Sequence, residues 1–290
     1  MIPMAIMGGA AALFGYLSSE EAKDKNRRAN EINKEAAEIA LNSKAEIESA
    51  NTNMNTSLER LGRNETSLLQ GDVASFDEMM KRIYDFGRRN NPSGLDELKR
   101  MGFNENVVNE VGRLARKAYE LSSIPTIKND GSSFAAVGLI GTGALLAGSA
   151  IAGPAMLLYG LMQSDEATAA IYEASSRLDE AKLFRERCKN ICVLFDAIGT
   201  RARQIDNLLD DLDRYFEPTV REVRRIVNGY NGYNFAAYPD YDKQMVFLTY
   251  QLMETIKIVV EAPLIQDDWS LNPDIDSKIA LGRERVALLK

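Results

Sequence analysis

Apolar residues recur every seven positions along the first part of the chain. The repeat comprises Ala22, Ala29 and Ala36, followed by Ala40, Ile47, Met54, Leu61 and Leu68. Glu, Lys, Asn, Arg and Ser fill most of the positions between them. A seven-residue apolar repeat gives a helix one stripe that packs against a partner helix. With Ser18 as a capping residue and acids in the first turn, the pattern predicts one long helix over residues 18–69.

A second and stronger series of sevens follows in the later part of the chain. It comprises Ala167, Ala174, Ala181, Cys188, Phe195, Ala202, Leu209 and Phe216, with Ile191, Ile198, Ile205 and Leu212 forming a parallel series beside it. This pattern predicts a helix of about 50 residues, roughly 75 Å long at 1.5 Å per residue. Pro218 is expected to break or kink this helix, which then continues over residues 219–227.

Shorter amphipathic patterns predict further helices over residues 72–86, 95–101, 104–121 and 243–260. The first of these is expected to stop at Gly87, before the breakers Asn91-Pro92 and Gly94. Strict alternation of apolar and polar residues, the signal of a half-buried strand, is almost absent.

The expected fold is therefore all-α, an elongated bundle of long antiparallel heptad helices with a central hydrophobic helical segment or hairpin at one end. Five regions are expected along the chain. They are an apolar N-terminal segment (1–17), a helical region with the long first helix (18–130), a hydrophobic glycine-rich segment (131–164), the long heptad helix with the C-terminal helix (165–262) and a C-terminal tail (263–290).

Residues 131–164, which we call the charge-free stretch, contain no charged side chain, although 27% of the whole chain is charged. An uncharged apolar run of 18 or more residues is the usual length signal of a membrane-spanning helix. The residues expected to enter a membrane are the large apolar ones: Phe134, Val137, Leu139, Ile140, Leu145, Leu146, Ile151, Met156, Leu157 and Leu158.

Small residues in the same stretch are spaced for close contact between helices. Those expected to pack closely are Gly141, Ala144, Gly148, Ala152, Gly153 and Gly160. Small residues four or seven apart let helix backbones approach closely, as in a glycine zipper. The Gly153-Pro154 pair suits a bend, so the stretch fits one tilted span, a bent hairpin, or a tightly packed hairpin buried permanently in a protein core.

The first 17 residues are also uncharged and mostly apolar. A secretory signal would carry a basic region before its apolar run, and none is present, although Ala10-Ala11-Ala12 leaves export open. The segment is expected either to pack on the body of the protein or to act as a second lipid-seeking segment. Basic residues precede the charge-free stretch and acidic residues follow it, so a single span would keep its N-terminal side cytoplasmic.

Composition argues against several classes of function. A net charge of −7 and a pI near 5.0 argue against nucleic-acid binding. The chain has no histidine, the commonest general base and metal ligand. The glycines around Gly141-Thr142-Gly143 lack the lysine of a phosphate loop and a preceding strand. We therefore expect no enzyme activity, catalytic residue, cofactor, metal or small-molecule substrate.

Three side-chain groups on the long helices have structural interpretations. Cys188 and Cys192 lie four apart at heptad positions, where core packing in a reduced protein is expected rather than a disulfide or a zinc site. A basic cluster, Arg221, Arg224 and Arg225, is expected to be a solvated face, with contact to anionic lipid or a partner as the alternative. The acidic residues of this helix are expected on its outside: Asp206, Asp210, Asp211 and Asp213.

Three parts of the chain resemble a group of bacterial helical proteins often labelled hypothetical or loosely "chemotaxis protein". The parts are the glycine-rich opening and the Ala/Glu/Lys coil after it (Gly8 to Ile39), the run AGPAMLLYGLM (Ala152 to Met162) and the close APLIQDDWSLNP (Ala262 to Pro273). This resemblance implies a bacterial protein near dynamin-like or defence genes, and hence membrane work. In layout the chain is also similar to the cytolysin A class of α-helical pore-forming toxins, although fold does not fix function.

The leading hypothesis is a cytoplasmic protein with conditional or stable membrane association. It would insert into a lipid membrane or assemble there through the charge-free stretch, as a pore-forming or membrane-remodelling protein, with a homo-oligomer or a helical protein as partner. The alternative is a soluble coiled-coil scaffold or adaptor in which the stretch is permanent core. A third interpretation is a constitutive membrane protein.

Overall fold

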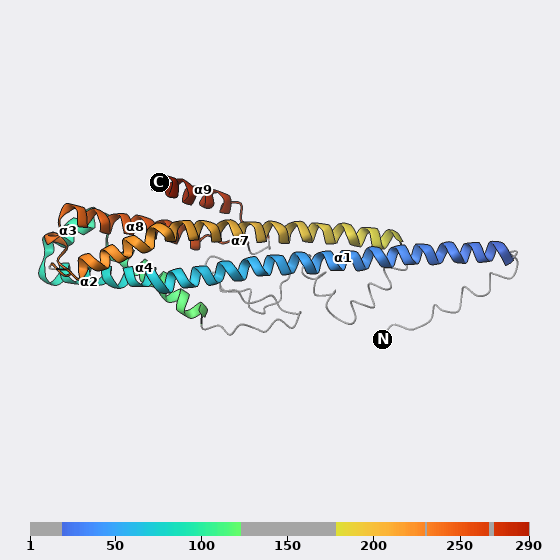
Figure 1. The fold of residues 1–290 in the computed structure, drawn as a ribbon, viewed down its shortest axis with the longest axis horizontal. Coiled ribbons are helices and arrows are strands. Elements are labelled where there is room, and N and C mark those ends of the chain that lie inside the picture. Colours follow the sequence, from blue (N-terminus) through green and yellow to red (C-terminus); the bar gives the residue numbers. More distant parts are fainter. Residues whose placement is uncertain (1–18, 123–177, 230, 267–269, 290) are drawn as a thin grey trace. The chain divides into compact units, whose positions relative to one another are not determined.

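The computed structural model describes residues 19–122, 178–229, 231–266 and 270–289. Within these ranges the chain is helical, with one isolated antiparallel bridge between Ile265 and Leu271 and no β-strand, so the all-α fold class is confirmed. The elements in chain order are α1 (Ser19–Leu68), the π-helix η1 (Leu69–Val73), α2 (Ala74–Asn90), α3 (Pro92–Arg100), α4 (Glu105–Ser122), α7 (Leu178–Val227), the 3-10 helix η2 (Phe235–Ala237), α8 (Asp240–Val260) and α9 (Ile275–Ala287) (Figure 1).

The chain divides into two compact units, and each of the two long helices contributes to both. The described part of unit 1 is residues 19–49 of α1 and 178–192 of α7. The described part of unit 2 is the remainder of α1 and α7 together with η1, α2, α3, α4, η2, α8 and α9.

The predicted heptad positions form the core wherever the structure describes their side chains. All of the following are buried: Ala36, Ala40, Ile47, Met54, Leu61, Leu68, Ala181, Cys188, Ile191, Phe195, Ile198, Ala202, Ile205, Leu209, Leu212 and Phe216. The apolar stripe of each long helix therefore faces protein, as the seven-residue spacing predicted.

The first long helix does not end where the pattern suggested. Leu68 and Ala74, on either side of η1, both have right-handed helical dihedral angles, so α1 passes through one π-helical turn directly into α2. The expected stop at Gly87 is wrong, because α2 continues to Asn90. A Cβ at Gly87 would lie 3.3 Å from Cβ of Leu95, so this glycine provides room for close packing with α3 rather than a break.

Asn91 separates α2 from α3, and the breakers after it begin the new helix. Asn91 has φ −148°, and its side-chain oxygen accepts a hydrogen bond from the Gly94 backbone N–H, as an N-cap does. Pro92 occupies the first position of α3, where its missing N–H and fixed φ suit a helix start. Residues expected to form a loop therefore form the beginning of a helix.

Pro218 lies inside α7 and does not break it, and the helix continues to Val227, as predicted for residues 219–227. The proline is exposed, whereas the neighbouring Phe216 and Val220 are fully buried. Packing on the buried face holds the helix together across the lost backbone hydrogen bond. Beyond it, α8 begins at Asp240, three residues earlier than predicted, and runs to Val260.

In unit 2, α1 and α7 run in the same direction. The residue pairs that join them advance together along both helices: Met54 with Gly199, Ser57 with Arg203, Arg60 with Asp206, and Asn64 with Asp210. The predicted antiparallel packing of the two long helices is therefore wrong.

The reason is a reversal of the chain between the two long helices. A Cβ at Gly112 of α4 would lie 3.3 Å from Asp77 Oδ2 and 2.5 Å from Lys81 Nζ, both on α2. Arg116, one turn further along α4, lies close enough to Asp77 to lower the pKa of its carboxyl. The helices α2 and α4 are therefore antiparallel. The chain has already turned back along α4 before α7 starts, so α7 repeats the direction of α1. Within unit 2, α4 runs towards the end at which α1 and α7 enter.

Candidate functional site

The residues predicted to enter a membrane and those predicted to pack closely all lie outside the described residues. The first set is Phe134, Val137, Leu139, Ile140, Leu145, Leu146, Ile151, Met156, Leu157 and Leu158, and the second is Gly141, Ala144, Gly148, Ala152, Gly153 and Gly160. The structure does describe α4 and α7, the helices that come before and after the charge-free stretch in the chain.

Four polar residues form an interhelical cluster between α1 and α7 in unit 2, which we call the polar layer: Arg60, Asn64, Asp206 and Asp210. Arg60 Nε lies 2.6 Å from Asp206 Oδ2, and Arg60 Nη2 lies 3.5 Å from Asp210 Oδ2. Asn64 Nδ2 donates to Asp206 Oδ1 at 3.0 Å and to Asp210 Oδ1 at 2.8 Å. Two donors on one helix therefore meet two carboxylates on the other.

The polar layer corrects the prediction that the acids of the second long helix all lie on its outside. The Asp206 side chain is only 2% exposed, whereas that of Arg60 is 60% exposed. A buried carboxylate is tolerated because hydrogen bonds and an opposite charge compensate for its lost hydration. The cluster thus fixes the register of α1 against α7, because a shift along either helix would leave Asp206 buried without its partners.

Contacts one to two turns earlier along both helices reinforce this register. A Cβ at Gly199 of α7 would lie 3.3 Å from Cα of Met54 of α1, so a side chain there would push the helices apart. Arg203 donates from Nη1 to Ser57 Oγ at 3.0 Å. The small residue and the polar contacts together hold the two parallel helices close.

A second group of carboxylates faces η1, where the helix changes from α to π geometry. Asp72 of η1 lies near Glu217 of α7, and burial, followed by repulsion from Glu217, raises the pKa of Asp72. Burial also raises the pKa of Asp213, with further repulsion from Asp72, Glu217 and Asp210. Asp213 Oδ1 is buried without a hydrogen-bond partner among the described residues. The carboxylates of Asp72, Asp213 and Glu217 therefore lie close together. The positive charges of Arg221 and Arg224 offset only part of the effect that raises the pKa of Asp72.

A third buried carboxylate, Asp77 of α2, faces α4. Lys81, one turn later on α2, donates to Asp77 Oδ2, whereas Oδ1 has no partner among the described residues. Burial is the main cause that raises the pKa of Asp77, and Lys81 and Arg116 oppose the rise. The Lys81 ammonium fits over Gly112, because a Cβ at that position would lie 2.5 Å from Lys81 Nζ.

The other groups singled out from the sequence form ordinary structural contacts. Cys188 is buried, Cys192 is half-buried, and neither forms a disulfide. Burial raises the pKa of Cys188 to about 12, which suppresses the reactive thiolate.

In the basic cluster, each arginine has a partner within the protein. Arg221 pairs with Glu217, Arg225 pairs with Glu222, and Arg224 donates to Ser75 Oγ. All three arginines are exposed. Mutual pairing on an exposed surface agrees with the interpretation of a solvated face.

Two properties of the described part of the chain bear on membranes and metals. None of the helices that the structure describes combines enough length with enough apolar character to cross a membrane. Nor do these described residues contain three or more Cys, Asp or Glu side chains grouped so that they could hold a metal ion.

The polar layer was missed because sequence spacing records which residues lie near an apolar stripe, not what opposes them. Asp206 lies four residues after Ala202, and Asn64 lies three after Leu61, so both occupy positions beside the stripe. Such positions carry charged pairs between coiled-coil helices. That spacing was the available signal, but the pairing of Arg60 with Asp206 depends on the parallel direction of the helices.

No protein family matches the chain, and neither a curated protein nor a solved structure is significantly similar to it.

Proposed function

We propose that this protein interacts with lipid membranes through the charge-free stretch, as a pore-forming or membrane-remodelling helical protein that assembles with copies of itself or with a helical partner. The stretch enters the bilayer, and the charged helices outside it act as the scaffold that carries it. In this proposal the protein is cytoplasmic, associates with a membrane conditionally or stably, and is not an enzyme.

One observation carries the proposal: 34 consecutive uncharged residues lie in the segment of the chain that joins α4 to α7. α4 runs towards the end at which α7 enters, and the charge-free stretch lies between Ser122 and Leu178 in the chain. A run of this length exceeds the roughly 20 apolar residues that a bilayer requires. A long uncharged run between two helices of a charged protein suits a segment that can be presented to a lipid surface.

The composition of unit 1 supports a conformational change during insertion. Its described core contains mainly small side chains, and large apolar side chains are exposed on it: Ile32 at 44%, Leu41 at 57% and Leu183 at 55%. Burial of small side chains contributes less free energy than burial of leucine or phenylalanine. Unit 1 is therefore the part whose contacts cost least to exchange for contacts with lipid or another chain.

The proposal is tested by liposome flotation and dye release with the full chain. Leu145→Asp and Gly148→Asp each place a charge within the stretch, which costs several kcal/mol in a bilayer, on the order of 3 at its centre. We expect both activities to fall at least about tenfold. Val193→Asp is the matched control, because Val193 is 68% exposed and lies outside the stretch. Circular dichroism checks that the helical content is unchanged, and retention of both activities in both variants overturns the proposal.

The polar layer favours a second candidate function, a coiled-coil scaffold in which the charge-free stretch is permanent core. A buried polar contact that fixes the register of two long helices suits a rigid spacer as well as it suits a membrane protein. Sedimentation in plain buffer with and without vesicles separates the candidates. A monodisperse species whose sedimentation does not change when vesicles are added supports the scaffold. A protein that only detergent extracts from membranes is instead a constitutive membrane protein.

A further inference from the structure

α8 and α9 pack closely at one end and separate at the other. They are antiparallel, since Val259 opposes Gly282 and Thr255 opposes Arg285. A Cβ at Gly282 would lie 2.6 Å from Leu208 Cδ2 of α7 and 3.3 Å from Val259 Cγ2, so only glycine allows α9 to approach this closely. Arg201 of α7 donates to Asp276 at 2.9 Å and holds the other half of α9. α9 is thus fixed before it ends at Ala287.

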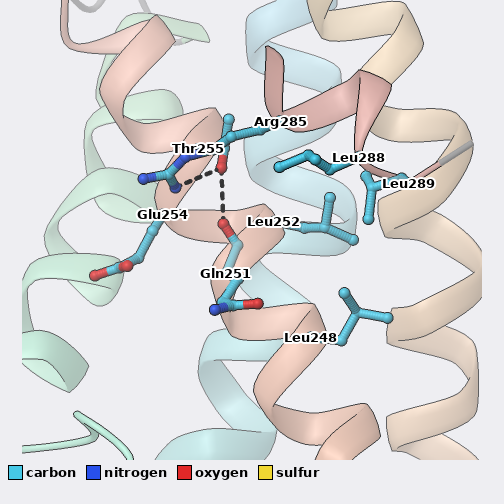
Figure 2. A pocket seen from close by; sticks show the side chains of 8 residues that line it. All are labelled: Leu248, Gln251, Leu252, Glu254, Thr255, Arg285, Leu288 and Leu289. Atoms are coloured by element: carbon cyan, nitrogen blue, oxygen red, sulfur yellow. Dashed lines mark hydrogen bonds between the residues drawn. The ribbon is translucent and has the colours of Figure 1, made fainter. Parts of the chain in front are cut away.

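Beyond this close contact the two helices enclose an open groove of about 330 Å³, which we call the α8–α9 groove. It is lined by Leu248, Gln251, Leu252, Glu254, Thr255, Arg285, Leu288 and Leu289 (Figure 2). Figure 2 shows the four leucines on one side and the polar side chains on the other. Leu288 is 81% exposed at the rim, the largest exposure among the large apolar side chains that the structure describes. The volume lies at the lower end of the range for small-molecule sites.

The polar side of the groove contains a guanidinium without a carboxylate partner. Arg285 Nη1 donates to Thr255 Oγ1 at 2.9 Å, and the same hydroxyl donates its proton to the Gln251 carbonyl at 2.8 Å, so its lone pairs are left to accept from the arginine and orient it. Among the described residues the partner of Arg285 is the Thr255 hydroxyl and no carboxylate, and the nearby Glu254 carboxylate accepts instead from Tyr250 Oη. A guanidinium has five N–H donors, so Arg285 retains donors for an anionic acceptor.

We propose that the α8–α9 groove binds an aliphatic carboxylate of medium chain length, with the carboxylate on Arg285 and the chain against the four leucines. The positive charge of Arg285 favours a negatively charged head group, and the leucine side of the groove favours an apolar tail. At roughly 30 Å³ for a water-sized group, the 330 Å³ of the groove corresponds to about eleven non-hydrogen atoms, close to the number in an acid of nine or ten carbons. This proposal does not depend on the proposed membrane function, because every residue it uses belongs to α8, α9 and the two residues after α9.

Isothermal titration calorimetry of the full chain with decanoate, below its micelle concentration, tests the proposal, and 1-decanol serves as the uncharged analogue. We expect saturable 1:1 binding of decanoate and binding of 1-decanol that is at least about tenfold weaker, as for loss of one hydrogen bond to a charged group. Arg285→Gln should weaken decanoate at least about tenfold and leave 1-decanol unchanged. Leu288→Asp should weaken both ligands, and because Leu288 is so exposed this variant should fold normally.

Arg283→Gln is the matched control, since Arg283 lies on the same helix, is exposed and does not line the groove. It should bind decanoate as the unaltered chain does. Three outcomes overturn the proposal: no saturable binding of decanoate, equal binding of decanoate and 1-decanol, or equal losses from the Arg283 and Arg285 substitutions. Flotation of the same variants with vesicles distinguishes failure of this proposal from failure of the proposed membrane function. Arg285→Gln should bind vesicles as the unaltered chain does.

Discussion

Unit 1 and unit 2 are built on the same two helices, but the side chains that each unit buries along α1 and α7 differ in size. In unit 1 the buried positions include Ala36, Ala40, Ser43 and Ala181, and in unit 2 they include Met54, Leu61, Phe195, Leu209 and Phe216. At about 25 cal/mol per Å² of apolar surface, the larger side chains contribute most of the burial energy. One repeat therefore yields a firmly packed core in unit 2 and a weaker one in unit 1.

The largest expected effect comes from truncating the core of unit 2. Phe216 is fully buried, and its ring packs edge-on against that of Phe76, with centroids 6.2 Å apart. Phe216→Ala should lower the free energy of unfolding by about 3–5 kcal/mol. Urea unfolding followed by circular dichroism measures the loss, with the exposed Tyr241→Ala as a control that should change it by less than about 0.5 kcal/mol. A loss below about 1 kcal/mol for Phe216→Ala would remove the contrast between the units.

Breaking the polar layer should have the next largest effect. Asp206→Ala removes the acceptor of Arg60 and one acceptor of Asn64, which leaves polar groups short of partners, and should cost about 2–3 kcal/mol in the same urea experiment. The exposure of Arg60 keeps the cost below that of a fully buried broken pair. Asp211→Ala, on the exposed side of α7, should change the midpoint little. If the two variants unfold alike, the polar layer does not hold α1 against α7.

A smaller effect is expected from overfilling unit 1. Ala36 and Ala181 are both fully buried, so Ala36→Leu should force the helices of unit 1 apart and cost about 1–2 kcal/mol. Hydrogen exchange of the backbone amides of residues 31–49 should show faster opening there, with residues 50–68 unaffected. Leu41→Ala, at an exposed position, provides the control. Slower exchange in Ala36→Leu would mean that the core of unit 1 has room for larger side chains.

The smallest expected effect concerns the carboxylates near η1, and it has a definite sign with pH. The pKa of Asp213 is raised in the folded protein, so between that raised value and its ordinary 3.8 the folded state binds a proton that the unfolded state does not. Stability from this group therefore increases as the pH falls through this window and decreases as the pH rises through it. Asp213→Asn should raise the free energy of unfolding at pH 7 by less than about 1 kcal/mol, because the group is only partly buried.

The advantage of Asp213→Asn over the unaltered chain should shrink when the pH is lowered from 7 to 5. Asp210→Asn is the comparison, since it removes a charge that repels Asp213 but keeps an amide oxygen that can accept from Asn64. A stability advantage of Asp213→Asn that grows as the pH falls would contradict a pKa of Asp213 that burial and repulsion raise. Asp72 and Asp77 should follow the same direction, since burial is the largest cause of their raised pKa values as well.

Heptad spacing predicted which faces of α1 and α7 are buried because a stripe of side chains is a property of one helix alone. The same reasoning missed two features of the backbone. Gly87 lies inside a helix, where packing with a neighbour outweighs local preference, and Asn91-Pro92 begins a helix instead of ending one. Asp206 was expected outside, because nothing in its own helix shows that Arg60 and Asn64 stand opposite.

The sequence by itself determined the helical class, the buried stripe of each long helix and the charge-free stretch, since all three follow from the order of apolar and charged residues along the chain. Tertiary structure decided the parallel direction of α1 and α7, the burial of Asp206 and the groove between α8 and α9. An apolar stripe packs equally well against a partner of either direction. The direction was therefore set by the reversal of the chain along α4 and by polar groups that meet their partners in only one register.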